Sequence, residues 1–92
     1  MQRVLIEKIN PVLRRAKVRR AAVFGSIARG DERADSDLDI LIELNPEVSL
    51  LQFINLKQQL EEASGRRVDM VEYDALKPAL RQKILSEQVA LF

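Results

Sequence analysis

The sequence contains no cysteine and no histidine among its 92 residues. The absence of cysteine excludes disulfide bonds and metal sites built from thiolates. The absence of histidine removes imidazole both as a metal ligand and as a general acid or base. Any metal site or proton transfer in this chain must therefore use other side chains.

Aromatic residues are also scarce, at 4% of the chain, so a core must consist mainly of leucine, isoleucine, valine and alanine. The 47% hydrophobic and 32% charged residues are typical of a soluble globular protein. The length predicts one domain over residues 1–92. No apolar run approaches the ~20 residues of a membrane span, and no signal-peptide pattern follows Met1, so we expect a cytoplasmic protein without membrane contact.

The charges of the chain are nearly balanced, with 15 lysines and arginines against 14 aspartates and glutamates and a net charge of +1. This balance argues against direct nucleic-acid binding. One local basic group either forms a solvated helix end or helps to dock a partner or a nucleotide. Its members are Arg14, Arg15, Lys17, Arg19 and Arg20.

Hydrophobic periodicity predicts helices that alternate with three strands. Pro11 either kinks the first helix or starts a second one, with Asn10 as its N-cap. This order of elements predicts an α/β (α+β) fold, a small sheet covered by helices on one face. In chain order we expect a helix over 2–16, a strand over 21–24, a turn or short helix from 26, a strand over 38–44, a helix over 50–64, a strand over 67–73 and a helix from 78 to about 88.

The segment DSDLDILIEL places two aspartates, Asp37 and Asp39, at the start of an apolar strand. Because side chains alternate along a strand, both lie on one face together with Leu41, and Leu38, Ile40 and Ile42 lie on the other. By the same alternation, Asp69 in the third strand lies on the face of Val71, opposite Val68 and Met70. If the two strands are neighbours, the three carboxylates converge and raise one another's pKa unless divalent cations bind. Oxygen ligands without histidine or cysteine favour Mg²⁺ or Mn²⁺ over zinc.

A second interpretation of these aspartates remains open. An Asp-x-Asp pattern is also what the solvent-exposed face of a half-buried strand produces. The turn upstream favours the metal site, because Gly25 permits close approach of a phosphate to the backbone and Ser26 opens a helical turn with free amides. Arg29, one turn later, offers a guanidinium suited to phosphate oxygens. Taken alone, Gly25-Ser26 fits a plain strand-to-helix turn in which Ser26 is the N-cap.

These residues resemble a known family. Gly25-Ser26, ten intervening residues and Asp37-Leu38-Asp39 match the G-S-x10-D-x-D signature of the DNA polymerase β-like nucleotidyltransferases. The run FGSIARGDERADSDLDILIEL is similar to the minimal nucleotidyltransferase (MNT) branch, small proteins encoded beside HEPN-domain partners. The resemblance extends from about Val18 to Phe92.

The resemblance implies a small mixed sheet with helices on one side and a transfer of a nucleoside monophosphate from an NTP to a hydroxyl. It implies that Asp37, Asp39 and Asp69 are the catalytic residues and the ligands of two Mg²⁺ ions, with Mn²⁺ as a substitute. It assigns the triphosphate-binding turn to Gly25 and Ser26, and Arg29 lies in the A-R-G-[DE] segment of the branch.

For the biological role, the resemblance implies an antitoxin that adds AMP from ATP to a tyrosine of a cognate HEPN ribonuclease toxin. Two alternatives stay open. In the first, the chain is a binding module that neutralises its partner by forming a complex without catalysis. In the second, it is a scaffold that senses nucleotides. Because 92 residues leave no room for an acceptor-binding domain, the acceptor is expected to arrive on a partner protein, in a homo- or hetero-oligomer.

Overall fold

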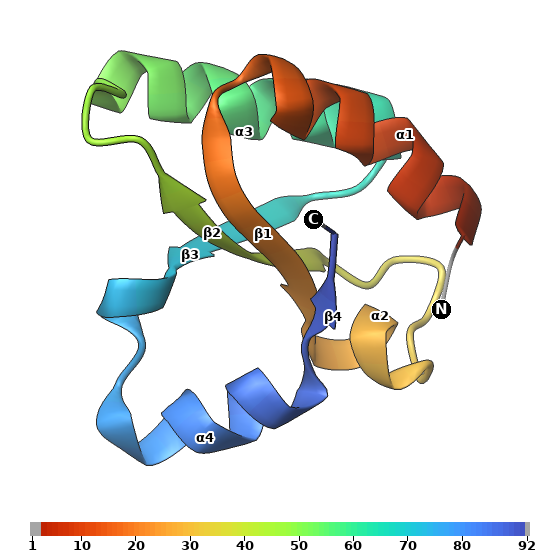
Figure 1. Cartoon of the computed structure of the whole chain (residues 1–92). Helices are drawn as coiled ribbons and strands as arrows, with labels where there is room; N and C mark the ends of the chain where they lie inside the picture. Colours follow the sequence, from red (N-terminus) through yellow and green to blue (C-terminus); the bar gives the residue numbers. More distant parts are fainter. Residues whose placement is uncertain (1–2, 92) are drawn as a thin grey trace.

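The computed structural model describes residues 3–91 of the chain, so residue 2 of the expected first helix lies outside the described residues. Helices and strands alternate as expected (Figure 1). The elements are α1 (Arg3–Arg15), β1 (Val18–Phe24), α2 (Gly25–Arg29), β2 (Leu38–Leu44), α3 (Leu50–Ser64), β3 (Val68–Glu72), a 3₁₀ turn η1 (Tyr73–Ala75), α4 (Pro78–Glu87) and β4 (Val89–Ala90).

Within residues 3–91, the strands form one mixed sheet in the order β3-β2-β1-β4. β1 pairs antiparallel with both β2 and β4, and β2 pairs parallel with β3. The parallel pair needs a crossover, and α3 provides it. The expected small α+β fold with a mixed sheet is therefore confirmed.

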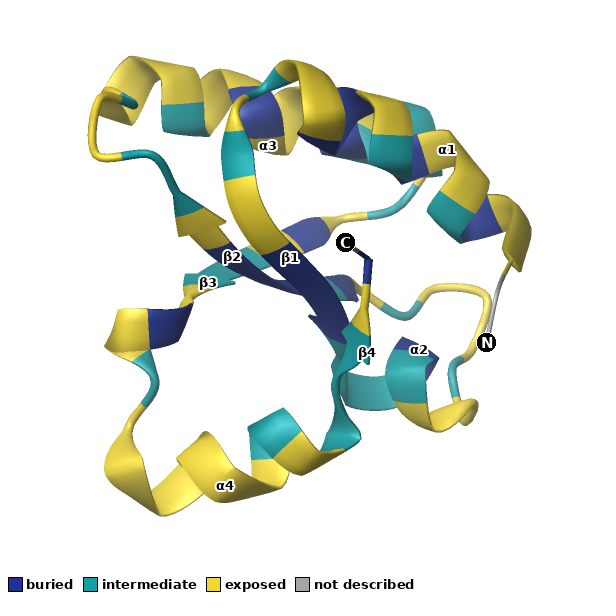
Figure 2. Ribbon diagram, viewed as in Figure 1, coloured by how far each residue is buried: buried dark blue, intermediate teal, exposed yellow. Residues whose placement is uncertain are grey.

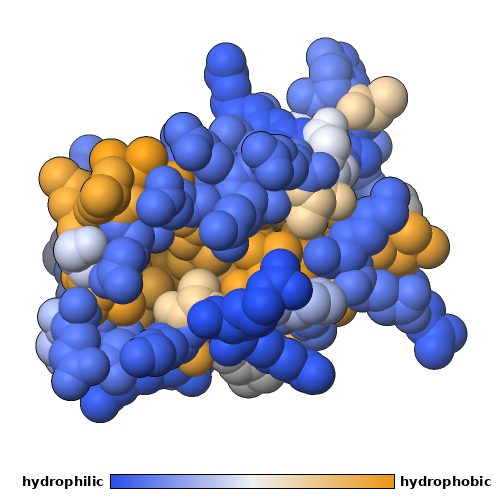
Figure 3. All heavy atoms as spheres, turned by 90° about the horizontal axis from the view of Figure 1, so that it is seen from above, coloured by the Kyte–Doolittle hydropathy of each residue, from blue (hydrophilic) through white to orange (hydrophobic). Residues whose placement is uncertain are grey.

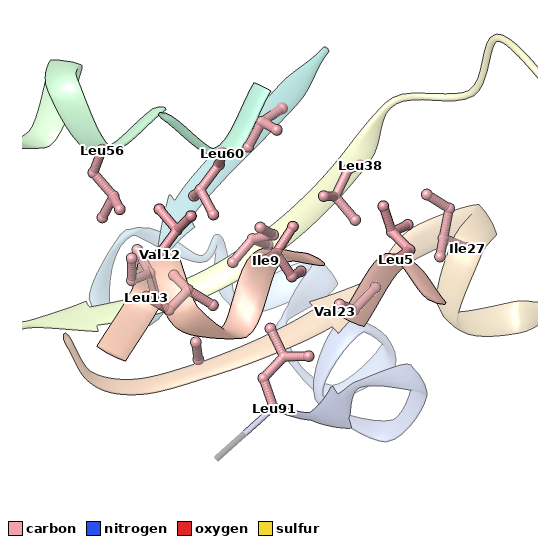
Figure 4. Packing of buried hydrophobic residues seen from close by; sticks show 14 residues of the cluster. Leu5, Ile9, Val12, Leu13, Val23, Ile27, Leu38, Leu56, Leu60 and Leu91 are labelled. Atoms are coloured by element: carbon pink, nitrogen blue, oxygen red, sulfur yellow. The ribbon is translucent and has the colours of Figure 1, made fainter. Parts of the chain in front are cut away.

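One face of the sheet carries the main hydrophobic core, and α1 and α3 cover it (Figure 4). The alternation of β2 predicts this arrangement, since Leu38, Ile40 and Ile42 all point into this core and are fully buried. Ile9 and Leu13 of α1 are likewise at 0% exposure. Burial of aliphatic side chains between these two layers is the principal source of stability.

The opposite face is less completely covered (Figure 2). Its buried residues are Ala22, Leu41 and Tyr73, and α4 lies over them through the half-buried Ile84 and Leu85. None of the residues of α4, Pro78–Glu87, is fully buried. This helix is thus held by a few contacts and leaves part of the sheet accessible.

Several boundaries differ from expectation. β1 starts at Val18 rather than at residue 21, because backbone pairing with the end of β2 continues through its charged residues. The first helix is one continuous helix with Pro11 inside it, and no second helix begins behind Asn10. The strand β4 was not expected, since two residues between a helix and the end of the chain carry no periodic signal.

The helix α3 agrees with its expected bounds for reasons visible in the sequence. Ser49 and Gln52 form a reciprocal capping box at its start, and Gly65 ends it in the left-handed conformation. The apolar residues Leu50 and Leu51 at its N-terminal end are exposed. Figure 3, which looks onto the α1 and α3 layer, shows hydrophobic surface gathered at the end of the molecule where α3 begins. No helix within residues 3–91 has the length and apolar character needed to cross a membrane.

Candidate active site

The three aspartates of the predicted site lie at one end of the sheet, on the face that α4 partly covers. Asp39 of β2 and Asp69 of β3 are direct partners in the parallel register. Their strand neighbours Leu41 and Val71 belong to the cluster on the α4 face, which confirms the expected division of faces. Asp37 stands immediately before β2 and shares this side by alternation.

Asp39 is the half-buried member of this group, whereas Asp37 and Asp69 are exposed. The pKa of the Asp39 carboxyl is raised from 3.8 to about 6, chiefly by burial and then by the negative charges of Asp69 and Asp37, while the positive charge of Arg29 opposes the shift. The proximity of like charges expected from the sequence is therefore present. A carboxyl that resists ionisation in this way is typical of a functional site.

Gly25, at the end of β1, leaves the space that Asp39 occupies. Phe24 pairs with Asp39 in the antiparallel register, so the turn that follows lies against that carboxylate. A Cβ atom on Gly25 would collide with Oδ2 of Asp39 and lie 3.1 Å from its Cγ. The φ of Gly25 is +74°, a conformation that favours glycine. The absence of a side chain at Gly25 is therefore required by the position of the Asp39 carboxylate.

Ser26 lies inside the short helix α2, so the alternative of Ser26 as a plain N-cap is wrong. The N-cap is Phe24, which makes no side-chain hydrogen bond to the helix. The first amides of any helix lack partners within it, and here they belong to Gly25 and Ser26. These donors and the Ser26 hydroxyl lie in the turn next to Asp39.

Arg29, which the sequence places near a phosphate, is engaged by two carboxylates. Its Nε lies 3.3 Å from Oδ2 of Asp31, and its Nη1 lies 3.2 Å from Oε2 of Glu87. The hydrogen bonds to Asp31 and Glu87 raise the pKa of Arg29 above its usual value. The contact with Glu87 joins α2 to α4 across 58 residues of sequence, and no local pattern predicts it.

A metal ion at this site would be held by carboxylate oxygens. Among residues 3–91, no group of three or more acidic side chains is already arranged as a metal cage. The donor chemistry nevertheless fits a hard divalent cation, because Asp39 carries a raised pKa caused in part by Asp69 and Asp37. A cation between these carboxylates would remove the repulsion that raises this pKa.

Comparison with known proteins identifies the family. A family model described as "Polymerase beta, Nucleotidyltransferase" matches residues 7–92. The chain belongs to this nucleotidyltransferase family. Members of the superfamily generally use divalent metal ions, in agreement with the oxygen-only donor set at Asp37, Asp39 and Asp69.

Two curated relatives are archaeal proteins. The chain is 44% identical over 72 residues to "Protein adenylyltransferase MntA" of Thermococcus cleftensis, covering 78% of this chain and 73% of the relative. It is also 44% identical over 82 residues to MJ0435 of Methanocaldococcus jannaschii, provisionally named a protein adenylyltransferase, covering 89% of this chain and 88% of the relative.

Two solved structures share the fold. One, provisionally described as a minimal nucleotidyltransferase, has a TM-score of 0.79 and 40% identity, covering 91% of this chain and 86% of its own. The other, a toxin–antitoxin structure with AMP-PNP, also has a TM-score of 0.79, at 26% identity, and covers 95% of this chain and 72% of its own. The fold and the enzyme class expected from the sequence are thereby confirmed.

Proposed function

We propose that this chain is a Mg²⁺-dependent protein adenylyltransferase that transfers AMP from ATP to a tyrosine hydroxyl of a HEPN ribonuclease toxin and so acts as its antitoxin. The observation that carries the proposal is the direct pairing of Asp39 with Asp69 beside the Gly25 turn. The relatives named as adenylyltransferases support the reaction, and the toxin–antitoxin structure with AMP-PNP supports both the nucleotide and the kind of partner.

In this proposal, Asp37 and Asp39 would hold two Mg²⁺ ions, and Asp69 would contribute to one of the two sites. The bound ions would neutralise the triphosphate and lower the pKa of the acceptor hydroxyl. The amides of Gly25 and Ser26, with the Ser26 hydroxyl, bind the β- and γ-phosphates, and Arg29 adds a positive charge. The exposed Asp69 can reach an acceptor from outside the sheet and accept its proton.

The chemistry of the step is a nucleotidyl transfer. The acceptor oxygen forms a bond to the α-phosphorus of ATP while the bond from that phosphorus to the β-phosphate oxygen breaks. Pyrophosphate leaves, and the proton of the hydroxyl passes to the carboxylate of Asp69. No histidine exists in the chain to take this proton, so a carboxylate is the natural acceptor.

The direct test mixes the purified protein with the HEPN protein encoded beside it, Mg²⁺, and ATP labelled on the α-phosphate. We expect label on the partner protein and a mass increase of one or more AMP units, with no label from γ-labelled ATP. Asp37→Asn should remove transfer. Asp74→Asn is a matched control, because Asp74 is an exposed carboxylate in η1 outside the site. Equal transfer by the two variants would contradict the assignment.

The same variants separate catalysis from neutralisation by binding alone. If AMP transfer protects against the toxin, Asp37→Asn should still bind the HEPN protein but leave its ribonuclease active. If this variant neutralises the toxin as well as the natural chain does, the chain neutralises its partner by occlusion, and AMP transfer is not the basis of the antitoxin role.

Asp69→Asn tests the division of roles among the three carboxylates. We expect the affinity for Mg-ATP to change by less than about threefold, while transfer falls by roughly two to four orders of magnitude, the usual range for loss of a general base. Isothermal titration with a non-hydrolysable ATP analogue and a transfer assay on the same preparation measure the two quantities. Loss of both would show one undivided metal cluster, and loss of neither would place Asp69 outside the site.

A further inference from the structure

The loop between α2 and β2, residues 30–37, carries Asp37 to the end of the sheet without forming a helix or strand. Its second half is a tight turn. The backbone N–H of Ser36 donates to the Arg33 carbonyl at 3.1 Å, and the N–H of Arg33 donates to Oγ of Ser36 at 2.7 Å. These two bonds join the ends of the turn, but both lie within the loop and do not attach it to the rest of the molecule.

The attachment comes from Arg66, in the short connection between α3 and β3. Its Nη1 donates to the carbonyl oxygen of Ser36 at 2.9 Å and to that of Arg33 at 3.2 Å. One guanidinium nitrogen therefore binds both carbonyls of the turn, from 30 residues away or more along the chain. Ser36 is the residue immediately before Asp37, so this contact lies one peptide from the catalytic carboxylate.

The other side of Asp37 is held by the same connection. The N–H of Leu38 donates to the carbonyl of Arg67 at 2.8 Å, which starts the pairing of β2 with β3. Asp37 thus lies between two residues, Ser36 and Leu38, that are bound to consecutive residues of one segment. That segment leads directly into Asp69, two residues after Arg67.

The connection that carries Arg66 is itself well anchored. Oγ of Ser64 accepts a hydrogen bond from the N–H of Arg66 at 3.2 Å. Oε2 of Glu61, in α3, accepts one from the N–H of Val68 at 3.0 Å. Arg66 is half-buried, whereas its neighbour Arg67 is exposed. The guanidinium of Arg66 is therefore presented to the loop from a fixed position, as a charged donor to two carbonyls.

We propose that Arg66 is a positioning residue for Asp37, which sets the place of this carboxylate relative to Asp39 and Asp69 by binding the turn that precedes it. The catalytic part of this inference rests on the proposed adenylyltransferase function. Displacement of a catalytic group by about 1 Å is sufficient to reduce a rate about 100-fold. The last residues of this loop have no regular structure and are bound by the Arg66 guanidinium, so their position is sensitive to its loss.

The test compares Arg66→Gln with Arg67→Gln, two adjacent substitutions that remove the same charge. Arg67 contributes its carbonyl to Leu38, and the substitution to glutamine leaves that carbonyl in place. We expect Arg66→Gln to lower kcat for AMP transfer by about 10- to 100-fold. Its KM for ATP should change less than threefold, because the Gly25–Ser26 turn is untouched. Arg67→Gln should keep both constants within about twofold of the natural chain.

Amide hydrogen exchange of the isolated protein, without nucleotide or metal, gives a readout that does not depend on activity. In Arg66→Gln the amide of Ser36 should exchange at least tenfold faster, while the amides of Ala22 and Val23 in β1 keep their rates. Faster exchange in β1 as well would mean a general loss of stability and would contradict a local positioning role. Equal behaviour of the two variants, in exchange and in kcat, would overturn the proposal.

The two parts of the test fail separately. If the natural chain transfers no AMP to any partner, the proposed function is wrong, and the exchange experiment still decides whether Arg66 holds the loop. If transfer occurs and Arg66→Gln keeps full kcat although Ser36 exchanges faster, the loop is held by Arg66 but its position does not control catalysis, and the positioning role is overturned.

Discussion

The two faces of the sheet differ in almost every property that determines folding and function. The face under α1 and α3 is filled with aliphatic side chains, several at 0% exposure, such as Ile9 and Leu13. On the face toward α4, the buried cluster consists of three residues, and α4 itself contributes no fully buried residue. The half-buried Asp39 lies at the end of this face. Stability is concentrated on one face. The proposed chemistry is assigned to the other face, whose packing is less complete.

The largest effect on stability should come from a deletion in the aliphatic core. Leu13→Ala removes a fully buried side chain and should lower the free energy of unfolding by about 2–5 kcal/mol. Leu80→Ala, on α4, is the matched control, because Leu80 is 51% exposed, and it should cost less than about 0.5 kcal/mol. Chemical denaturation of both variants measures the difference. Similar losses would show that α4 contributes to the core as much as α1 does.

Gly25 lies beside Asp39 at the proposed site, and its substitution should affect both stability and activity. Gly25→Ala adds a Cβ that collides with the Asp39 carboxylate and forces an L-residue to adopt a φ of +74°. The backbone strain alone should cost about 1–3 kcal/mol of unfolding free energy. Gly30→Ala is the control, since Gly30 has a φ of +82° but open space around its Cβ position. A loss of transfer in Gly25→Ala but not in Gly30→Ala would show that the space at Gly25, and not the backbone strain alone, is needed for activity.

The sequence predicts the parts of this fold that depend on local chemistry. Hydrophobic periodicity predicts β2 and α3 with their observed bounds, and the structure adds the capping box of Ser49 and Gln52 that starts α3. The convergence of Asp39 and Asp69 also follows from alternation, once β2 and β3 are neighbours. The contacts of Glu87 with Arg29 and of Arg66 with Ser36 do not follow, because each joins segments at least 30 residues apart through a single side chain. No pattern of residue types records such a contact.

The pH dependence of the unfolding free energy should show how much the raised pKa of Asp39 destabilises the fold. Between pH 4 and pH 6 the carboxyl of Asp39 keeps its proton in the folded chain, with a pKa of about 6, while the unfolded chain has lost it. The folded state then binds more protons, so Asp39 makes stability fall as pH rises through this window, and the loss stays constant above it.

Asp39→Asn removes this cost. In the absence of divalent metal it should raise the unfolding free energy at pH 7.5 by about 1–2 kcal/mol, less than the full pKa shift implies because solvent screens the exposed part of the side chain. At pH 4 the variant and the natural chain should be equally stable. Denaturation curves at the two pH values, with a metal chelator present, decide the matter. An equal gain at both values would mean that packing, not charge, distinguishes the variant.

The smallest expected effect concerns the ion pair that links α2 to the loosely packed α4. Glu87 binds Nη1 of Arg29 and therefore competes with a triphosphate for this guanidinium. Glu87→Gln should therefore tighten ATP binding by about two- to fivefold, in line with the weak energy of a solvent-exposed ion pair, and the gain should shrink with added salt. Glu62→Gln, an exposed carboxylate on α3, is the control and should leave ATP affinity unchanged. If Glu87→Gln weakens ATP binding instead, Glu87 orients Arg29 toward the nucleotide, and α4 belongs to the nucleotide site rather than competing with it.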